Sequence, residues 1–346
     1  MKRKILLSGA AGFLGSHLVS YILEKTDWDL VLLDRLDFSG TLNRLAEVIQ
    51  DKDKSRITYV WHDLKAPINE ITSKMIGEID DVIHLAASSH VDRSLIDPLS
   101  FIMDNVVGTT NLLVWAKDVG MKREYNFNEK KHNYFGKFIN FSTDESFGPA
   151  LNGTSHKEDA PHKPSNPYAA AKAGQEDIGY SFYISYNLPV ITSHTMNNFG
   201  TMQHPEKLVP KTIRSVIKGE SVPIFSKLSP TGEIIAAGSR FWLNTVNMAN
   251  AVLFLLDKGV AGESYNIIGF DELTNLQMAE KIASIIGKPL VYQFKDVYEV
   301  RNGHDVRYAL DGSKMRDLGW IPEVSFEESL IRTVKWYMDE KNSKWI

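Results

Sequence analysis

The sequence contains no cysteine among its 346 residues. This absence excludes disulfide bonds, thiolate nucleophiles and cysteine-ligated zinc or iron–sulfur sites, and it fits the reducing cytoplasm, where we expect the protein to act. No metal site is expected. The chain also lacks a strong charge of one sign, because 39 basic and 43 acidic residues give a net charge of −4. We therefore expect neither a nucleic-acid partner nor a membrane partner.

Long hydrophobic runs are missing as well. No apolar stretch approaches the roughly twenty residues that a membrane-spanning helix needs. The N-terminal segment MKRKILLSGAAGFLG begins with basic residues, as a signal peptide does, but glycines soon interrupt its apolar run. The segment therefore predicts a strand.

Short apolar runs alternate with amphipathic stretches in the first part of the chain. Strands buried on both faces of a parallel sheet are predicted for KILLSG, DLVLLD, ITYVWHD, DDVIHLAA and KFINFS. Helices are expected near 13–24, 41–50 and 100–119. This alternation predicts an α/β fold with a Rossmann-type doubly wound parallel sheet. The polar segment 121–136 lacks periodicity and predicts an inserted surface loop.

After about residue 197 the pattern changes to proline-punctuated pieces, with helices expected near 247–257 and 274–286. We predict a Rossmann domain over residues 1–197, which also receives a strand and a helix from about 240–268. A smaller mixed α/β lobe is predicted over 198–346. No long linker separates the two parts, so the cleft between them is the expected ligand site.

A glycine-rich turn follows the first predicted strand. Gly9, Gly12 and Gly15 in GAAGFLG would allow a tight turn and bring free N–H groups of a helix N-terminus close to a pyrophosphate. Asp34 ends the second strand, where a carboxylate accepts hydrogen bonds from an adenosine ribose. The pattern predicts a dinucleotide cofactor. NAD is favoured because Asp34 would repel a 2′-phosphate, although the neighbouring Arg35 leaves NADP open.

Two further strand ends are expected to face the adenine and the second ribose. Asp63 closes VWHDL, and Leu85, Ala86 and Ala87 follow the fourth strand. His84 lies within that apolar strand, so we expect it in the core.

Two adjacent carboxylates, Asp144 and Glu145, stand where the run KFINFS ends. Such a pair before Gly148 is also typical of a solvated turn. In a regular strand the two side chains would leave on opposite faces. A joint catalytic role therefore requires the chain to leave strand geometry here.

A tyrosine and a lysine stand four residues apart in SNPYAAAKAGQE. Ser165 or Asn166 can cap a helix and Pro167 suits its first turn, so Tyr168 and Lys172 are expected on one helix face. A lysine ammonium and a nicotinamide charge nearby would favour the phenolate, which is the form that acts as a base.

Taken together, GAAGFLG, LAASSHVDRS, STDES, YAAAK, NNFG, HPEKLVP and GHDVRYALD resemble the extended short-chain dehydrogenase/reductase superfamily. Within it they are similar to the dTDP-glucose 4,6-dehydratases, over about residues 4–338. The Asp-Glu pair is the discriminating motif, since related epimerases usually carry small residues there.

The resemblance implies NAD-dependent dehydration of a nucleotide-diphosphate hexose to a 4-keto-6-deoxy sugar. Tyr168 would remove the 4-OH proton, Glu145 the C5 proton, and protonated Asp144 would help the 6-OH leave as water. Thr143 would bind the 4-oxygen and Lys172 would hold the tyrosine and the nicotinamide ribose. A sugar-nucleotide 4-epimerase, which needs Tyr168 and NAD but neither acid, is the alternative.

The resemblance also implies binding residues and a homodimer paired through helices around 100–119 and 168–186. The implied cofactor residues are Gly9, Gly12, Phe13, Leu14, Gly15, Asp34, Arg35, Asp63, Leu64, Leu85, Ala86, Ala87, Ser89, Tyr168, Lys172 and Asn198. The implied substrate residues are Ser89, Asn105, Thr143, Asn197, Lys207, Leu208, Pro223, Phe225, Arg240, Asn266, Arg301, His304 and Tyr308. The block SRFWLNTVNM departs from the family's R-D-W-x-x-V-x-D pattern, so the sequence leaves the nucleotide open.

Overall fold

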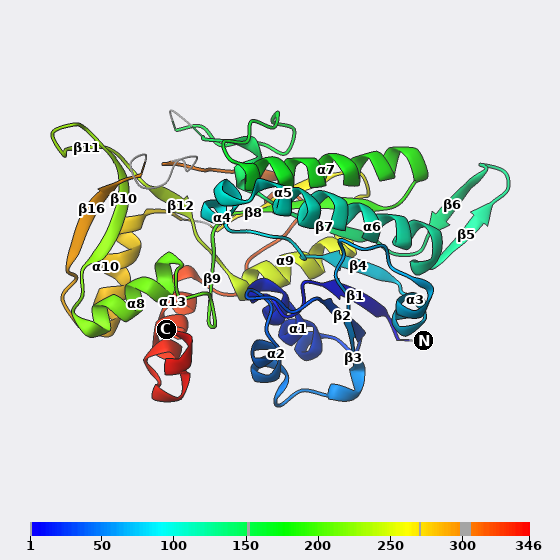
Figure 1. Ribbon diagram of the computed structural model, residues 1–346, viewed down its shortest axis with the longest axis horizontal. Helices are drawn as coiled ribbons and strands as arrows, with labels where there is room; N and C mark the ends of the chain where they lie inside the picture. Colours follow the sequence, from blue (N-terminus) through cyan, green and yellow to red (C-terminus); the bar gives the residue numbers. More distant parts are fainter. Residues whose placement is uncertain (1, 151–152, 270, 298–305) are drawn as a thin grey trace.

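A seven-stranded parallel sheet forms the centre of the larger part of the molecule (Figure 1). The computed structural model describes residues 2–150, 153–269, 271–297 and 306–346. The strands lie in the order β14-β8-β7-β4-β1-β2-β3, and neighbouring strands are parallel throughout. Their bounds are β1 (Lys4–Ser8), β2 (Asp29–Asp34), β3 (Ile57–Trp61), β4 (Asp81–His84), β7 (Phe138–Thr143), β8 (Val190–Thr195) and β14 (Ser264–Ile267).

The five strands predicted from the sequence are all present in this sheet, and the Rossmann-type doubly wound fold is confirmed. The strand order reverses between β1 and β4. In sheets of this kind, ligands bind beyond the carboxyl ends of the strands at that reversal. The fold thus places the glycine-rich turn after β1 and the acidic pair after β7 along one edge.

Helices cover both faces of the sheet because side chains along each strand alternate between the faces. Ile5 and Leu7 of β1 belong to the apolar cluster on one face, and Leu6 belongs to the cluster on the other. His84 is fully buried, as expected. The first face packs against α1 (Phe13–Lys25), α2 (Leu42–Ile49) and α9 (Thr245–Lys258), and the second against α3 (Glu70–Ile76), α6 (Gly108–Trp115) and α7 (Pro167–Tyr186).

The long helix predicted near 100–119 is present, but two segments of it are π-helical. It follows α4 (Val91–Ile96) and consists of α5 (Pro98–Phe101), the π-helix η2 (Ile102–Val107), α6, and the π-helix η3 (Ala116–Gly120). π-Helical turns are frequent at functional sites. Here η2 carries Asp104, which lines a cavity at the strand ends.

The prediction of a surface loop over 121–136 was wrong. The segment forms an antiparallel hairpin of β5 (Arg123–Asn126) and β6 (Lys131–Tyr134), which projects at the right of Figure 1. Tyr125 faces His132 across the hairpin with ring centroids 5.2 Å apart. Cross-strand aromatic pairs of this kind stabilise a hairpin despite a polar sequence.

A smaller group of elements lies beside the sheet, at the left of Figure 1. The predicted helix near 274–286 is present there, and the one near 247–257 is α9. Across the described ranges, no helix has the length and apolar character needed to cross a membrane. The elements of this group are β9 (Asn198–Phe199), α8 (Leu208–Lys218), β10 (Val222–Leu228), β11 (Ile234–Ala237), β12 (Ser239–Phe241), β13 (Leu243–Asn244), β15 (Glu272–Thr274), α10 (Asn275–Ile286), β16 (Tyr292–Asp296), α13 (Phe326–Met338) and the 3-10 helix η5 (Glu340–Trp345). The short helix α12 (Ser313–Asp317) instead packs against β14 of the main sheet.

Candidate functional site

Three adjoining cavities follow the carboxyl ends of the strands. The first cavity lies at the ends of β1 to β3 and has about 640 Å³ of empty space. The central cleft, about 1340 Å³, runs past the ends of β7 and β8, and the outer cavity, about 1140 Å³, lies against the smaller group of elements. All three volumes include the open solvent at the mouths. Gly9 and Gly12 line both the first cavity and the central cleft, and Glu145 and Lys207 line both the central cleft and the outer cavity. The three spaces together therefore suit two extended ligands that meet near Glu145.

The glycine-rich turn packs the start of α1 tightly against β1 and β4. Gly9 has a φ of +74°, and a Cβ there would lie 2.6 Å from the backbone nitrogen of Ala86. A Cβ on Gly15 would lie 2.1 Å from the carbonyl oxygen of Gly9. Gly12 precedes the helix and no side chain caps its first turn. The first N–H groups of α1 can therefore bind an anion.

Asp34 joins the end of β2 to this turn. Its Oδ2 accepts a hydrogen bond from the backbone N–H of Ala11 at 2.8 Å, and its Oδ1 accepts one from Leu36 at 2.9 Å. Burial raises the pKa of Asp34, and these two backbone bonds oppose that rise. Because each carboxylate oxygen has a second lone pair, Asp34 can still accept hydrogen bonds from a ribose.

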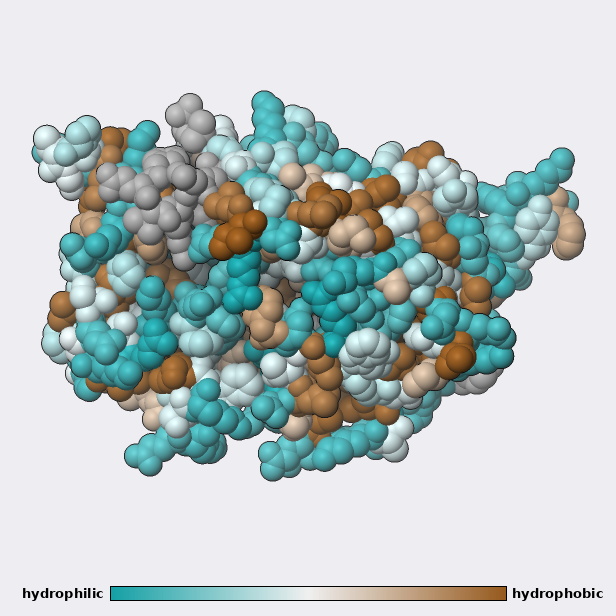
Figure 2. Space-filling model, viewed as in Figure 1, coloured by the Kyte–Doolittle hydropathy of each residue, from teal (hydrophilic) through white to brown (hydrophobic). Residues whose placement is uncertain are grey.

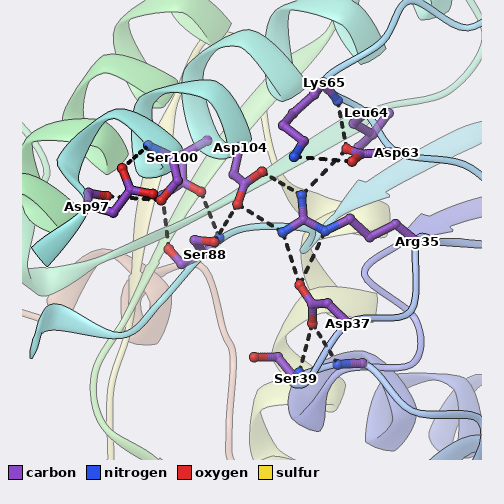
Figure 3. A network of polar contacts seen from close by, with 12 residues as sticks. Arg35, Asp37, Ser39, Asp63, Leu64, Lys65, Ser88, Asp97, Ser100 and Asp104 are labelled. Atoms are coloured by element: carbon purple, nitrogen blue, oxygen red, sulfur yellow. Dashed lines mark hydrogen bonds and ion pairs between the residues drawn. The ribbon is translucent and has the colours of Figure 1, made fainter. Parts of the chain in front are cut away.

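Arg35, which follows Asp34, is clamped by three carboxylates (Figure 3). Its Nη1 and Nη2 form a two-point pair with Asp104 at 2.5 and 2.9 Å, and Nη2 also lies 3.0 Å from Asp37. A third contact reaches Asp63 at 3.5 Å. The hydrogen bond with Asp104 is the main cause of the raised pKa of Arg35. These three carboxylates compete with any 2′-phosphate for the guanidinium.

The first cavity as a whole is acidic. Two cations line it, Arg35 and Lys65, against four carboxylates. A 2′-phosphate would bring about two further negative charges. The site that the sequence left open to NADP is thus electrostatically unfavourable for it.

The chain leaves strand geometry where the acidic pair begins. β7 ends at Thr143, and the 3-10 turn η4 (Asp144–Phe147) follows at once. Thr143 caps this turn by accepting a hydrogen bond from the backbone N–H of Glu145 at 3.4 Å, and Gly148 ends it with a φ of +76°. Asp144 and Glu145 consequently both line the central cleft.

Asp144 is buried and only partly hydrogen-bonded. Its Oδ1 accepts a bond from the Thr143 hydroxyl at 2.9 Å, whereas its enclosed Oδ2 has no partner among the described residues. Burial and the neighbouring Glu145 raise the pKa of Asp144 to about 7. Glu145 is less buried, and its Oε2 accepts a bond from the Asn166 amide at 3.2 Å. The first acid of the pair can therefore hold a proton near neutral pH.

Tyr168 and Lys172 lie on the first turns of α7, whose N-cap is Asn166 and which begins with Pro167, as predicted. Both side chains are buried and line the central cleft. Burial lowers the pKa of Lys172 to about 7, and its Nζ donates to the carbonyl oxygen of Phe141 at 2.5 Å.

The net effect of the protein is to raise the pKa of Tyr168, contrary to the expected effect of Lys172. Burial raises that pKa, the charge of Glu145 raises it further, and a hydrogen bond with Thr143 opposes the rise. The protein by itself therefore keeps Tyr168 as the neutral phenol. A positive charge that favours the phenolate has to come from a bound ligand.

Comparison with known proteins agrees with this geometry. The sequence profile of the GDP-mannose 4,6 dehydratase family matches residues 6–333. The chain belongs to this family. A dTDP-glucose 4,6-dehydratase of Neisseria gonorrhoeae is 36% identical, over 99% of this chain and 98% of that protein.

Solved structures of the 4,6-dehydratases and of epimerases share the fold. The dTDP-glucose 4,6-dehydratase of Streptomyces venezuelae, crystallised with NAD and TYD bound, superimposes with a TM-score of 0.82 at 32% identity, over 98% of both chains. The UDP-glucose 4-epimerase of Thermus thermophilus, in complex with NAD, gives a TM-score of 0.81 at 24% identity, over 97% of this chain and 99% of that chain. The second likeness supports the fold alone.

Most residues that the sequence assigned to the site line one of the three cavities. Arg301 and His304 lie outside the described residues. The residues brought to the cavities are Gly9, Gly12, Phe13, Leu14, Gly15, Asp34, Arg35, Asp63, Leu64, Leu85, Ala86, Ala87, Ser89, Thr143, Asp144, Glu145, Tyr168, Lys172, Asn197, Asn198, Lys207, Leu208, Pro223, Phe225, Arg240 and Tyr308.

Two predicted substrate residues are not brought to the cavities. Asn105 is fully buried, and its amide exchanges two hydrogen bonds with the backbone of Ser88 at 2.7 and 3.0 Å. Asn266 is also fully buried, and its side chain contacts His194 at 3.1 Å and donates to the carbonyl oxygen of Asp311 at 3.0 Å. Both amides are already used within the protein, so their positions do not fit direct contact with a ligand.

Sequence reasoning missed several residues that line the cavities. Asp104 and Ser88 lie in the first cavity, joined by a hydrogen bond from the Ser88 hydroxyl at 2.6 Å. A single acid in the apolar stretch FIMDNVV was the available signal for Asp104. His90 and Arg44 line the central cleft. Arg44 is in an ordinary amphipathic helix, so no pattern distinguished it.

A buried ionic group behind the cleft was also missed. Glu176 of α7 lies 2.7 Å from His194 and 3.2 Å from His162, and it accepts a hydrogen bond from the Ser142 hydroxyl. Burial alone would raise the pKa of Glu176, but the interactions with His194, His162 and Ser142 outweigh it and keep that pKa well below its ordinary value. Because Ser142 precedes Thr143, the group fixes the end of β7 from behind.

Proposed function

We propose that the protein is an NAD-dependent nucleotide-sugar 4,6-dehydratase. Its substrate would be a nucleotide-diphosphate hexose similar to dTDP-glucose, and its product the 4-keto-6-deoxy sugar. One observation carries the proposal: Asp144 and Glu145 line the same cleft as Tyr168, and Asp144 has a pKa of about 7. The 4,6-dehydratase relatives and the NAD-bound structure from Streptomyces venezuelae support it.

Each reacting side chain has a distinct role in this proposal. NAD, when bound, supplies the hydride acceptor at C4 and the donor at C6, and its positive ring favours the phenolate of Tyr168. Tyr168 takes the 4-OH proton with help from Thr143. Glu145 takes the C5 proton that the 4-keto group has acidified, while protonated Asp144 donates to the leaving 6-OH. Two carboxyl groups whose surroundings separate their pKa values can perform these opposite proton transfers.

The cavities suggest where the two ligands lie. We assign the adenosine half of NAD to the first cavity and the nicotinamide half to the central cleft. We assign the sugar nucleotide to the outer cavity, where Arg240 and Lys207 provide cations for its diphosphate. In this division residues 1–197 hold most of the cofactor, and residues 198–346 hold most of the nucleotide of the substrate.

The 4-epimerase alternative explains fewer features. It would use Tyr168 and NAD but would have no use for a protonated carboxyl group beside Glu145. Burying Asp144 costs free energy. A catalytic role in dehydration accounts for this cost, whereas the epimerase reaction gives no reason for it.

The proposal is tested by incubating the protein and NAD with dTDP-, UDP-, CDP- and GDP-hexoses and following the loss of one water by mass spectrometry. The Glu145→Gln variant should still oxidise C4 and exchange hydrogen there, but it should lose water elimination. Asp159→Asn, at an exposed site, is the control and should behave like the parent. Full dehydration by Glu145→Gln, or epimerised product without water loss, would reject the proposal.

We further propose that the protein forms a homodimer through α4–α6 and α7. Apolar side chains gather over these helices (Figure 2), among them Ile96 at 85% exposure, Leu99 at 67% and Ile184 at 63%. Burying them against a second copy would remove them from water. We place the protein in the cytoplasm, which the lack of cysteine allows. Light scattering tests the dimer, and Ile96→Glu should yield monomers.

A further inference from the structure

Arg44, near the start of α2, is a buried cation that holds three chain segments together. It is 5% exposed. Its Nε donates to the carbonyl oxygen of Met202 at 3.2 Å, and its Nη1 donates to those of Ala11 at 3.0 Å and Ser39 at 2.7 Å. These acceptors come from the glycine-rich turn, the segment after β2 and the segment after β9. Arg44 thus contacts three chain segments beside the central cleft, which Gly12 also lines.

Arg44 forms no ion pair in the part of the chain that the structure describes, and Asp34 is the one carboxylate there whose charge acts on it from a distance. Its hydrogen bonds all go to neutral carbonyl groups, and burial lowers its pKa. A buried charge without a partner of opposite charge is unfavourable. The ring of Trp345, 5.5 Å from the guanidinium carbon, compensates only a part of this cost.

A second buried arginine shows the contrast. Arg56 is 9% exposed and donates to the carbonyl oxygens of Leu23 and Thr26 at 2.5 and 2.7 Å. It also has an acidic partner, Asp53, at 3.9 Å, and it lines none of the three cavities. Arg56 therefore has a structural role, whereas Arg44 lacks an ion pair among the described residues and lines the central cleft.

The two N–H groups of Nη2 remain for a ligand. A guanidinium carries five N–H donors, and the three bonds described above use Nε and Nη1. Nη2 is not among the enclosed atoms that lack a partner, so it is reachable by solvent. Arg44 lines the central cleft together with Gly12 and Leu14, at the uncapped start of α1.

We propose that Arg44 is a ligand of the cofactor diphosphate, adding a cation to the anion site at the start of α1. A planar guanidinium suits phosphate oxygens because it can donate two parallel hydrogen bonds. The inference rests on the proposed use of a dinucleotide by this cleft. It adds a charged ligand, from α2, to the backbone groups of the glycine-rich turn. It also makes diphosphate binding and the position of the three segments depend on one side chain.

Calorimetric titration with ADP-ribose and with adenosine separates this role from a purely structural one. Arg44→Met should weaken ADP-ribose binding about tenfold or more, as expected for a lost hydrogen bond to a charged group, and should leave adenosine binding unchanged. Arg44→Lys keeps the charge and should retain most of the preference for ADP-ribose over adenosine. Arg56→Met is the matched control, and it should lower the melting temperature without changing that preference.

The outcomes are distinct. Equal weakening of both ligands, or unchanged ADP-ribose binding by Arg44→Met, would overturn the role of Arg44. If Arg44→Met does not fold, Arg44→Gln and Arg44→Lys decide, because only the lysine should keep the preference. A parent protein that binds neither NAD nor ADP-ribose would instead reject the proposed function. A parent that dehydrates its sugar nucleotide while Arg44→Met binds ADP-ribose normally would refute only this inference.

Discussion

Replacing Asp144 by asparagine should slow dehydration strongly and, at the same time, stabilise the protein. The carboxyl group has a pKa of about 7 in the folded protein and an ordinary value of 3.8. The folded state therefore binds this proton more tightly than the unfolded chain. Stability from the group is complete below about pH 4, is lost as the pH rises from about 4 to 7, and stays low above that range. Asparagine carries no charge, so the variant avoids this loss of folding stability.

The size of this effect follows from the two pKa values. A difference of about three pKa units corresponds to about 4 kcal/mol at pH 8, at 1.36 kcal/mol per unit. At pH 5 less than half of that penalty has developed. For a chain of 346 residues, 4 kcal/mol is equivalent to a rise of about 5 °C in melting temperature. The Asp144→Asn variant should thus gain most of its advantage between pH 5 and pH 8.

Catalysis should change in the opposite direction. A general acid contributes about 10²- to 10⁴-fold, so water elimination should slow by this factor while C4 oxidation persists and NADH accumulates. In the parent protein, elimination should fall about tenfold between pH 6 and pH 8, as the acid loses its proton.

Melting curves at pH 5 and pH 8 measure the change in stability, and mass spectrometry of the product measures the change in water elimination. Asp159→Asn is again the exposed control. A variant that is no more stable than the parent at pH 8 would refute the assigned protonation state. A variant that still eliminates water at the parent rate would refute the role as acid.

Three other substitutions examine separate features. Asp104→Asn should release Arg35 from its two-point pair and narrow the preference for NAD over NADP. Titration with both nucleotides measures this preference, and an unchanged ratio of the two affinities would contradict the role of Asp104 in holding Arg35. Glu176→Gln should leave the buried His194 without its anion and lower the free energy of unfolding by about 3–5 kcal/mol. Denaturant titration measures this change, and an unchanged unfolding midpoint would argue against a buried ionic group. Gly148→Ala should reduce activity strongly, because its Cβ would lie 2.3 Å from the backbone oxygen of Lys163. Turnover like that of the parent would show that the turn tolerates rearrangement.

The main sheet and the helix that carries Tyr168 could be predicted because their signals are local. Apolar runs mark the strands, and Asn166 with Pro167 marks the start of α7. The departure from strand geometry after Thr143 could also be predicted, since two neighbouring acids with one task cannot share a regular strand. The hairpin over 121–136 could not, because cross-strand contacts rather than periodicity stabilise it.

The positions of Asn105, Asn266 and Asp104 could not be derived from the sequence. Each depends on partners far away along the chain, such as Ser88 for Asn105 and His194 for Asn266. Whether a polar side chain faces a ligand or satisfies a buried backbone group is decided by tertiary packing. The clamp on Arg35 is a case where such packing changes the chemistry, since the sequence alone left that guanidinium available to a 2′-phosphate.

Burial acts in opposite directions on Asp144 and Lys172, which both line the central cleft, and brings both pKa values close to 7. It raises the pKa of Asp144 to about 7 and lowers that of Lys172 to about 7, because desolvation disfavours whichever form is charged. For both groups it is the largest cause. Burial of the two side chains by the protein, more than any single charged neighbour, therefore sets the protonation of Asp144 and of Lys172. A substitution that admits water at Tyr168 should return both pKa values toward their ordinary ranges, leaving Asp144 ionised and Lys172 charged. Asp144 would then lack the proton that it needs to act as an acid, although both side chains remain in place.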